Sequence, residues 1–301
     1  MPTETALPLR IGARTVFTLR RRLVRRRLSL EEALAGARPA LPSLQADEHG
    51  YLITALPEDM VDRLARGTDV RPFVRQRYRR FYARLDQDFD AWLAGFSAKS
   101  RSTCRRKLKR FAERSGGRID VRAFASEAEI ERFYEAARAV STRTYQERLL
   151  DAGLPDGPEA LAQMRELARA GRARGWLLFL EDRAIAYLYA PAEGSALVYA
   201  YLGYDPDFAD LSPGTVLQLE AMRQLMAERG FDLFDFTEGE GQHKKLFSTG
   251  SIDCVDLLLV RPRLANLVIG HALNGFDAAV ALAKRVAHRI GAGGVVRRLA
   301  R

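Results

Sequence analysis

The sequence predicts a mixed α/β protein of the α+β type, in which a mostly antiparallel sheet is flanked by helices. Between residues 176 and 204, three runs rich in β-forming residues are joined by tight turns, as in an antiparallel meander. Segments on both sides carry apolar residues every three or four positions, together with helix start and stop signals. A chain of 301 residues, 47% of them hydrophobic, can bury one large core or two smaller ones.

Residues 1–30 are expected to form a basic amphipathic arm. Val16, Leu19 and Leu23 recur at the spacing of one helix face, and no acid follows Glu4 in the arm. Its arginines are Arg10, Arg14, Arg20, Arg21, Arg22, Arg25, Arg26 and Arg27. Such a helix can adhere to an anionic bilayer, act as a removable organelle-targeting peptide, or be a solvated face without a role. A secretory signal is not expected, because the arm has no unbroken apolar run.

Residues 31–96 are expected to form an N-terminal α/β extension. Prolines divide this stretch into short helical and strand-like pieces; they are Pro39, Pro42, Pro57 and Pro72. The run RYRRFYARL at 77–85 favours a strand that leads into a helix near 89–96. The sequence assigns no function to this extension.

A second basic block, SRSTCRRKLKRF at 100–111, predicts a helix. Arg101, Arg105 and Lys109 fall on one face, while Leu108 and Phe111 supply its buried side. Nucleic acid is not an expected partner, because aromatic residues are not interleaved with the basic ones and no DNA-binding spacing is recognised. Such a helix can hold a diphosphate, although most of these side chains, taken singly, are expected to be solvated.

Two further helices are predicted before the meander. The segment SEAEIERFYEAARAV at 126–140 opens on Ser126, with Glu129 three residues later, which is the pattern of a capping box. The stretch at 154–175 predicts a second helix that is ended by glycines. The meander itself follows as three sequential antiparallel strands at 176–181, 183–190 and 196–204.

The last part of the core contains a helix between strands. Ser212 is its candidate N-cap, Pro213 its first residue and Gly230 its end. A buried strand, FDLFDF, is expected at 231–236, and SIDCVDLLLV is expected to be the last strand at 251–260. The two strands are separated by a charged turn.

Residues 261–301 are expected to form a C-terminal amphipathic basic helix. Its apolar residues recur every three or four positions, at Ile269, Leu273, Phe276, Val280, Ala283, Val286 and Ile290. The opposite side carries His271, Asn274, Asp277, Lys284 and His288. Such a helix can pack on its own protein, on a partner, or in a lipid interface.

Composition restricts the class of protein. The net charge of +10 and the pI near 9.9 favour an anionic partner. No apolar run approaches the roughly 18 residues needed to cross a bilayer. Cys104 and Cys254 lack the spacing of a metal or redox site, so neither a zinc site nor a disulfide framework is expected, and a reducing cytoplasm fits. Cys254 lies in an apolar strand and is expected to belong to the core.

Two short stretches carry chemistry. A strand that turns at Ser-Pro-Gly into a helix leaves backbone N–H groups unpaired at the positive end of the helix dipole, which suits a diphosphate. The charged turn DFTEGEGQHKKLF at 235–247 gathers carboxylates, a histidine and two lysines between apolar anchors. Taken alone, the first is also a good cap and the second an ordinary solvated connection. Both features can emerge at one side of one sheet, where open sheets place ligands.

These stretches together resemble the CelD/BcsL-type branch of the GNAT acyltransferase superfamily. The matching residues are Tyr204, Asp205 and Pro206; Ser212, Pro213 and Gly214; Asp235, Phe236, Thr237, Gly239 and Glu240; and Lys244 with Phe247. The upstream SAKSRSTCRRKLKRF is similar to that branch's basic-helix entry, so the resemblance covers about residues 97–260. It implies a GNAT-like fold and an acyl-coenzyme A co-substrate, with no permanently bound cofactor and no metal.

The resemblance places that co-substrate. Its diphosphate would lie at the helix start formed by Ser212, Pro213, Gly214 and Thr215, with Arg101 and Arg105 of the basic helix. One departure concerns His243, which stands where the branch usually has tyrosine. The pKa of an imidazole is near 6.5, whereas that of a tyrosine phenol is about 10, so the imidazole suits proton transfer at neutral pH.

Direct attack on a thioester requires a base for the nucleophile, stabilisation of the carbonyl oxygen, and a proton for the thiolate. The candidate bases are His243, Glu238 and Glu240. Lys244 can stabilise the oxyanion or pair with a carboxylate, and Tyr204 or Tyr201 can protonate the sulfur. A purely structural Glu–Lys pairing in this turn is the alternative.

The acceptor is expected to be an amphiphilic long-chain amine. Some relatives in the resembled branch look like bacterial ceramide synthases, and two basic amphipathic ends suit a substrate dissolved in an anionic membrane. Candidate acceptor-binding residues are Thr144, Tyr145 and Gln146, for which a plain helix extension is the alternative. The expected location is the cytoplasm, on the inner face of the cytoplasmic membrane. Acetylation of polysaccharide and a non-enzymatic nucleic-acid or lipid binding module remain the other readings.

Overall fold

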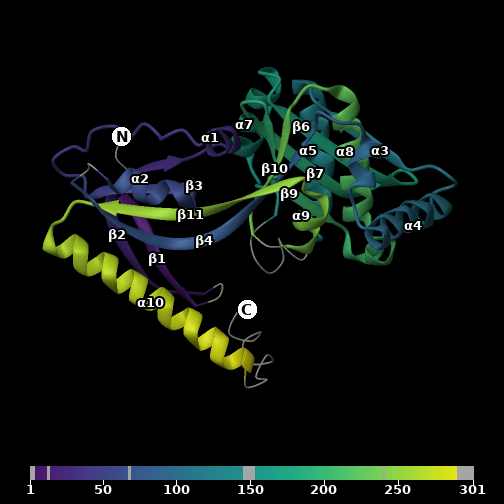
Figure 1. Ribbon diagram of the computed structural model, residues 1–301. Helices are drawn as coiled ribbons and strands as arrows, with labels where there is room; N and C mark the ends of the chain where they lie inside the picture. Colours follow the sequence, from purple (N-terminus) through teal and green to yellow (C-terminus); the bar gives the residue numbers. More distant parts are fainter. Residues whose placement is uncertain (1–3, 12–13, 67–68, 145–152, 240, 290–301) are drawn as a thin grey trace. The chain divides into compact units, whose positions relative to one another are not determined.

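The computed structural model describes residues 4–11, 14–66, 69–144, 153–239 and 241–289 (Figure 1). The chain divides into two compact units, one formed by Met1–Arg79 with Ile252–Arg301 and the other by Arg80–Ser251. Strands β4 (Arg71–Arg84) and β11 (Gly250–Val260) each contribute residues to both units. Within the described residues, no helix combines the length and apolar character needed to span a bilayer.

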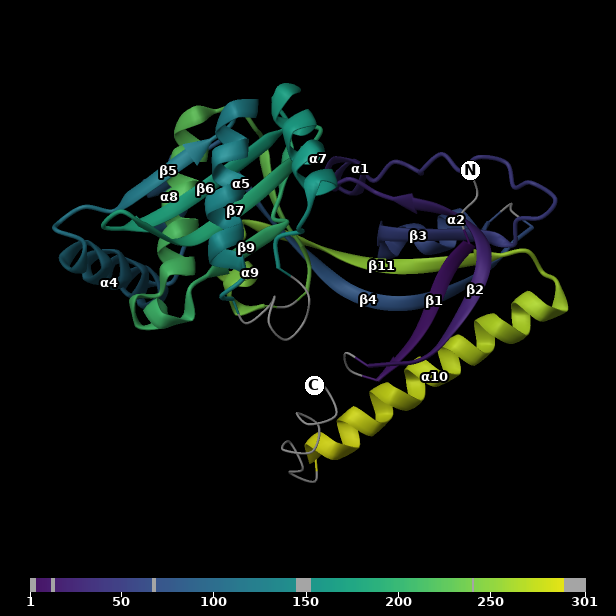
Figure 2. The same ribbon diagram turned by 180° about the vertical axis from the view of Figure 1, so that it is seen from behind.

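The first unit is built on a sheet with the strand order β1-β2-β3-β11-β4. Its further elements are β1 (Glu4–Ile11), β2 (Arg14–Arg27), α1 (Leu30–Ala35), β3 (Gly50–Pro57), η1 (Glu58–Met60), α2 (Val61–Ala65) and α10 (Leu264–Arg289). One face of the sheet is covered by a cluster that includes Met60 and Leu64 of η1 and α2. The other face buries Leu273 of α10. Helix α10 runs along that side of the sheet in both views (Figures 1 and 2).

The N-terminal arm is a β-hairpin, so the predicted helix is wrong. Strand β1 pairs antiparallel with β2, and the end of β2 pairs parallel with β3. Leu19 and Leu23 lie four residues apart, a spacing that places them on one face of a helix or of a strand alike. Leu23 is buried on the α10 side of the sheet. Val16 lies seven residues before Leu23, an odd number that places it on the opposite face of a strand, and it is 57% exposed. The arm is therefore an integral part of the first unit.

Ion pairs explain how the sheet accommodates so basic a strand. Arg20 pairs with Glu4, Arg22 with Asp47 at 2.5 Å, and Arg26 with Glu32. Glu32 also completes a capping box with Ser29 at the start of α1. Acids from outside the strand thus balance part of the arm's charge.

The second unit contains the predicted meander, and its strand order is β4-β10-β8-β7-β6-β5, with β9 also paired to β7. Its strands are β5 (Asp120–Phe124), β6 (Ala173–Leu180), β7 (Arg183–Glu193), β8 (Ala196–Val198), β9 (Tyr201–Tyr204) and β10 (Leu233–Glu238). Strands β6 to β9 pair antiparallel, as predicted, while β10 pairs parallel with β8. The mixed, mostly antiparallel sheet flanked by helices is confirmed. The third predicted strand is divided, since residues 199–200 separate β8 from β9.

Helices cover both faces of this sheet (Figure 2). They are α3 (Phe89–Ala94), α4 (Ala98–Arg114), α5 (Glu127–Ser141), α7 (Pro158–Arg169), the short η2 (Pro206–Leu211), α8 (Pro213–Glu228) and α9 (Gln242–Phe247). A large core cluster joins α3, α4 and α8 to one face, and a second cluster joins α5 and α7 to the other. The helices predicted at 100–111 and 126–140 are present, and the one predicted at 154–175 is present as the shorter α7, because residues 173–175 already belong to β6.

The caps follow local rules in one helix and depart from them in another. At the start of α5, the predicted capping box forms, and the backbone N–H of Ser126 donates to Glu129 at 2.9 Å. At the start of α8, Ser212 occupies the N-cap position but has a left-handed backbone with φ of 55°, and its side chain caps nothing. The helix ends at Glu228, and Arg229, one residue before the predicted Gly230, takes the left-handed C-cap conformation.

Candidate active site

The strand pairing opens beside β9. Strand β10 pairs with β8 only as far as Asp235, which lies opposite Val198. The following Tyr199 donates its backbone N–H to the carbonyl of Asp235 at 2.8 Å, and beyond that point β9 pairs with β7 alone. Among the described strands, the second edge of β9 therefore has no partner. An unpaired strand edge offers N–H and C=O groups to an extended ligand.

The start of α8 lies against β9. A side chain at Gly214 would meet Leu202 at 3.2 Å and Tyr204 at 3.4 Å, so the missing Cβ lets the strand and the helix start approach closely. Pro213 carries no N–H, and the first turn of α8 contains no acid. This arrangement leaves the positive end of a 16-residue helix next to the residues of β9.

A lysine from α4 joins this helix start. Lys107 donates from Nζ to the Thr215 hydroxyl at 3.1 Å. The predicted Arg105 is exposed, and the predicted Arg101 donates to the carbonyl of Ala94 at 2.8 Å, which ties α4 to the end of α3. The structure thus brings Lys107 to the predicted diphosphate site, while a role there for Arg101 and Arg105 remains a prediction.

The end of β10 is fixed by a buried ion pair. Asp235 is fully buried and accepts from Arg80 Nε at 3.1 Å and from Arg80 Nη2 at 2.5 Å, and Arg80 is itself buried. The same carboxylate accepts from the backbone N–H of Thr237 at 2.8 Å. Thr237 has a left-handed backbone with φ of 63°, and Gly239 follows with φ of 109°. Asp235 therefore shapes the turn that leads from β10 to the charged motif.

Lys244 closes this turn from α9. Its ammonium donates to the Thr237 hydroxyl at 3.2 Å and to the backbone carbonyl of Glu238. Burial lowers the pKa of Lys244 from its ordinary value, although Glu238 and Asp235 act in the opposite direction. Both contacts hold residues of the turn, so Lys244 acts as a structural tie in this arrangement. The predicted role on an oxyanion stays a prediction.

His243 lies at the exposed start of α9, with its ring centroid 6.0 Å from that of Tyr199. Burial of one side of the imidazole, and then the charge of Lys244, lower the pKa of His243 below its ordinary value of 6.5. The imidazole is therefore neutral at pH 7 and can accept a proton. Of the other candidate bases, Glu238 is exposed at the end of β10, and Glu240 lies outside the described residues.

The helix start and His243 share one face of the sheet. Leu202 of β9, Val216 of α8 and Leu246 of α9 all pack in or against the same core cluster. Gly214 adjoins the end of β9 at Tyr204, whereas His243 adjoins Tyr199 just before the start of β9. Tyr199 and Tyr204 are five positions apart, which corresponds to about 16 Å along an extended chain. An elongated ligand that lies along β9 can therefore reach both places.

The two tyrosines of β9 differ in surroundings. Tyr204 is 36% exposed, with its ring against Gly214. Tyr201 packs against the cluster on the α5 side of the sheet. Only Tyr204 thus lies on the face that carries His243 and the start of α8, which favours it as the proton donor. Tyr199 is not a suitable donor, because burial raises its pKa far above the ordinary value of 10.

The predicted acceptor residues are partly outside the described chain. Thr144 is fully buried, its hydroxyl donates to the carbonyl of Ser141 at 2.8 Å, and its methyl group faces Gly203 of β9. These contacts belong to a core residue. Tyr145 and Gln146 lie outside the described residues, so their role in acceptor binding remains a prediction.

Sequence reasoning missed Lys107 and Arg80. Lys107 lies three residues after Cys104 and four before Phe111, both of which are buried. This spacing marks the helix side that faces the core, and it was a usable signal. The signal for Arg80 was Asp235 itself, because a carboxylate within a buried strand requires a partner. Both cysteines are buried, as predicted for Cys254, and burial raises the pKa of the Cys104 thiol.

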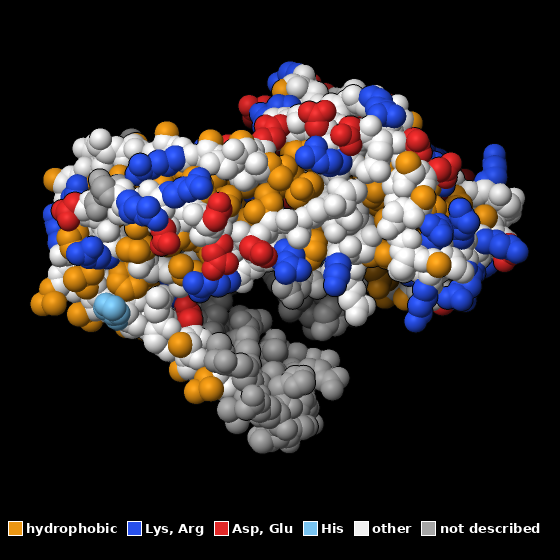
Figure 3. Space-filling model, viewed as in Figure 1, with side chains coloured by type: hydrophobic (Ala, Val, Ile, Leu, Met, Phe, Trp, Pro, Cys, Tyr) orange, Lys and Arg blue, Asp and Glu red, His pale blue; other side chains and the backbone are white. Residues whose placement is uncertain are grey.

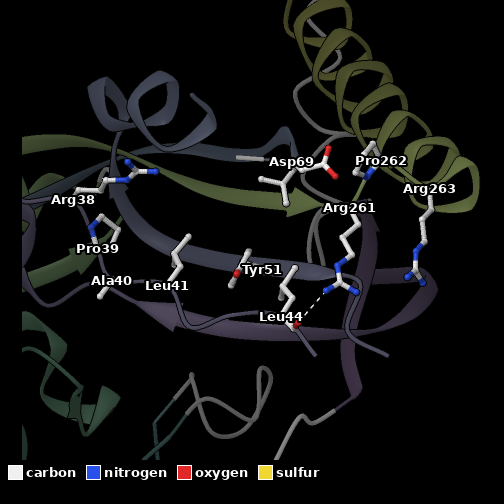
Figure 4. A pocket seen from close by; sticks show the side chains of 11 residues that line it. Arg38, Pro39, Ala40, Leu41, Leu44, Tyr51, Asp69, Arg261, Pro262 and Arg263 are labelled. Atoms are coloured by element: carbon white, nitrogen blue, oxygen red, sulfur yellow. Dashed lines mark hydrogen bonds between the residues drawn. The ribbon is translucent and has the colours of Figure 1, made fainter. Parts of the chain in front are cut away.

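Cavities are also found outside this arrangement. One of about 630 Å³ in the second unit lies between α3, the start of α4 and α9, and is lined by Trp92, Phe96, Gln242 and Lys245 among others. A cavity of about 870 Å³ in the first unit is lined by Leu41, Leu44 and Tyr51, with Arg38 on one side and Arg261 and Arg263 on the other (Figure 4). There, Arg261 is engaged with the carbonyl of Leu44 at 3.0 Å. None of the predicted site residues lines either cavity.

Comparison with known proteins gives one family match. The family described as the acetyltransferase (GNAT) domain matches residues 98–245. No curated protein sequence matches the chain.

Solved structures resemble the chain at low identity. The C-terminal domain of a putative lysylphosphatidylglycerol synthetase from Agrobacterium fabrum superposes with a TM-score of 0.51 at 13% identity, over 80% of this chain and 73% of that one. FemX superposes with a TM-score of 0.55 at 14% identity, over 74% and 75% of the two chains. A conserved protein of unknown function from Bacteroides thetaiotaomicron gives 0.50 at 12% identity, over 71% and 70%. At these identities the structures show a shared fold.

Proposed function

We propose, from the premise that residues 98–245 form a GNAT-type acyltransferase domain, that this chain transfers an acyl group from acyl-coenzyme A to a long-chain amine. The observation that carries the proposal is the placement of two features on one face of β9. The start of α8, with Lys107, adjoins Tyr204, and His243 adjoins Tyr199. The first suits the diphosphate of acyl-coenzyme A and the second suits a base near its thioester.

The residues then have separate tasks in the transfer. Neutral His243 accepts a proton from the acceptor amine, whose nitrogen forms a bond to the thioester carbon. The carbon–sulfur bond breaks, and Tyr204 donates its phenolic proton to the departing thiolate. The amide and free coenzyme A are the products. The unpaired edge of β9 offers backbone groups to the extended arm between diphosphate and thioester.

Two features support the proposed acceptor class: the resemblance to the CelD/BcsL-type branch and the apolar surface of the chain. The motif residues Asp205, Asp235 and Lys244 all take part in the fold of the site. Asp205, for example, is buried and accepts hydrogen bonds from Arg143 at 3.2 Å and from Arg183. An exposed apolar helix face on α10 suits an enzyme whose substrate is dissolved in a membrane. A sphingoid base, which would give a ceramide-type product, fits both features.

A substrate assay tests this proposal directly. Purified protein is incubated with palmitoyl-coenzyme A and sphinganine in mixed micelles, and the products are followed by mass spectrometry and by release of the coenzyme A thiol. We expect an N-acylated sphinganine. Consumption of acetyl-coenzyme A with a soluble oligosaccharide, while palmitoyl-coenzyme A stays inert, would instead assign the chain to polysaccharide acetylation.

Exchange of Lys107 for methionine is expected to raise the KM for acyl-coenzyme A roughly tenfold with little change in kcat. One charge-assisted hydrogen bond to a phosphate would be lost, which is worth about 1.5 kcal/mol. Initial rates over a range of acyl-coenzyme A concentrations measure the effect. The matched control is Lys109→Met on the same helix, whose side chain is 79% exposed and pairs with Glu113. Equal KM values for both variants would remove Lys107 from the binding site.

A further inference from the structure

The outward face of α10 is apolar, which the sequence pattern did not indicate. Between Leu264 and Leu282, none of the described exposed positions carries Lys, Arg, Asp or Glu: eight are apolar residues or glycine, and the ninth is His271. These positions are Leu264, Ala265, Val268, His271, Ala272, Gly275, Ala278, Ala279 and Leu282. Successive members lie one or three residues apart and form one continuous stripe along the helix. From Leu264 to Leu282 the stripe is about 27 Å long.

The helix cannot bury this stripe by rolling, because its other side is already engaged. Leu273 is fully buried against Phe73 and Leu258, and Leu267 and Ile269 pack at the edge of the same cluster. Gly270 lies against the ring of Phe73, where a Cβ would approach to 2.5 Å. Ile269 and Leu273 belong to the apolar series that the sequence predicts for this helix, and both pack on the chain's own sheet.

An ion pair fixes the same orientation further along the helix. Asp277 of α10 pairs with Arg75 of β4 at 3.0 Å, and the Arg75 side chain is only 13% exposed. Burial lowers the pKa of Arg75 and raises that of Asp277, so the pair is partly removed from water. Among the described side chains of α10, the charged one, Asp277, thus faces the sheet, whereas apolar groups face outward.

That distribution is the reverse of an ordinary surface helix. Solvent-facing positions usually carry Lys, Glu, Arg or Asp, and a continuous exposed apolar patch marks an interaction surface. Leu264 is 80% exposed, Val268 58% and Leu282 56%. In Figure 3, hydrophobic side chains follow the described part of α10 on the side that this view presents.

Charge identifies the partner. Arg261 and Arg263 directly precede the helix. After Asp277 the sequence contains no acid, and its basic residues are Lys284, Arg285, Arg289, Arg297, Arg298 and Arg301. The apolar stripe is therefore bounded by positive charge at both ends. Anionic lipid headgroups complement such a pattern, and the stripe itself suits the interface between headgroups and acyl chains.

A second copy of the chain is a poor partner for the apolar stripe of α10. Parallel packing of two α10 stripes would place like ends together, and antiparallel packing would place Arg261 and Arg263 beside the basic C-terminal residues. Either arrangement brings positive charges together. The basic hairpin is a weaker candidate for the membrane contact, because Arg20, Arg22 and Arg26 are paired with acids.

We propose that the outward stripe of α10 lies on the surface of an anionic bilayer and docks the protein there. This inference deepens the proposed function, since a membrane-dissolved amine must be reached from the bilayer surface, but its test does not depend on catalysis. The full-length protein is sedimented with vesicles of phosphatidylcholine containing about one third phosphatidylglycerol. The wild-type protein is expected to partition onto these vesicles, and more weakly onto pure phosphatidylcholine or at high salt.

The decisive comparison uses two substitutions of equal chemistry. Val268→Glu places a charge in the stripe and is expected to lower partition at least tenfold. Val16→Glu places the same charge on the hairpin, at a residue with nearly the same exposure of 57% against 58%, and is expected to bind like the wild type. Thermal melting confirms that both variants fold. Full binding by Val268→Glu, or loss of binding by Val16→Glu alone, would overturn the proposal.

Two further measurements separate the remaining outcomes. Light scattering without lipid gives the oligomeric state, and a wild-type dimer that Val268→Glu converts to a monomer would assign the stripe to a second copy. Release of coenzyme A with micelle-dispersed amine reports on the acyltransferase independently. Retained turnover with lost vesicle binding supports the docking surface, whereas vesicle binding without any turnover would contradict the proposed function alone.

Discussion

Replacement of His243 by alanine is expected to lower turnover of acyl-coenzyme A with the amine acceptor by about 10² or more. The imidazole is the group on the β9 face whose surroundings keep it neutral at pH 7, because burial and Lys244 lower its pKa. Without it, the proton that leaves the acceptor amine loses the base that the proposal assigns to it. Stopped-time assays of coenzyme A release at saturating substrate measure the loss.

The pH profile gives a second readout of the same group. A base acts only when unprotonated, so kcat/KM should rise with pH through the pKa of His243, at a point below 6.5. Lys244→Met removes the positive charge that contributes to the low pKa, so the acidic limb should move to higher pH. Titration of the imidazole by NMR checks the same shift without reference to activity.

Glu238→Gln serves as the matched control for His243. This residue lies at the end of β10, in the same turn, and its side chain is exposed. The expected rate for this variant is within a few-fold of the wild type. A near-normal rate for His243→Ala combined with a large loss for Glu238→Gln would transfer the role of base to the carboxylate.

Local signals predicted the elements of the second unit well. The box of Ser126 and Glu129, the tight turns of the meander and the Ser-Pro-Gly helix start each involve residues close in the chain, so a sequence pattern contains them. The same holds for His243 and Lys244, which lie together on α9. Distant pairings were not accessible in this way.

The N-terminal arm shows why. Its leucine spacing satisfies both a helix and a strand, and the choice is made by pairing with β3, more than 20 residues away. Its apparent excess of charge is balanced by Asp47 and Glu32, which follow the arm in sequence. Likewise, the apolar stripe of α10 could not be recognised, because only the position of the sheet decides which of its two sides is buried.

Replacement of Arg80 by methionine is expected to destabilise the second unit by about 3–5 kcal/mol. The substitution leaves the fully buried carboxylate of Asp235 without its counter-charge. Equilibrium unfolding in urea, followed by tryptophan fluorescence, measures the change in that unit selectively, since Trp92 and Trp176 are the chain's two tryptophans and both lie in it. The double variant Arg80→Met with Asp235→Asn should recover part of the loss, because a neutral amide has a smaller cost of burial.

A surface pair provides the contrast. Arg122 pairs with Asp120 at 2.6 Å, but the two side chains are 52% and 43% exposed, and Arg122→Met is expected to change the free energy of unfolding by less than about 1 kcal/mol. A comparably small effect for Arg80→Met would mean that Asp235 does not hold the end of β10. If the large effect is found, the turnover of Arg80→Met should also be lower than that of the wild type in buffer without urea, where the variant is still folded. Asp235 accepts from Thr237, whose hydroxyl accepts from Lys244 beside His243, so loosening the carboxylate displaces the base.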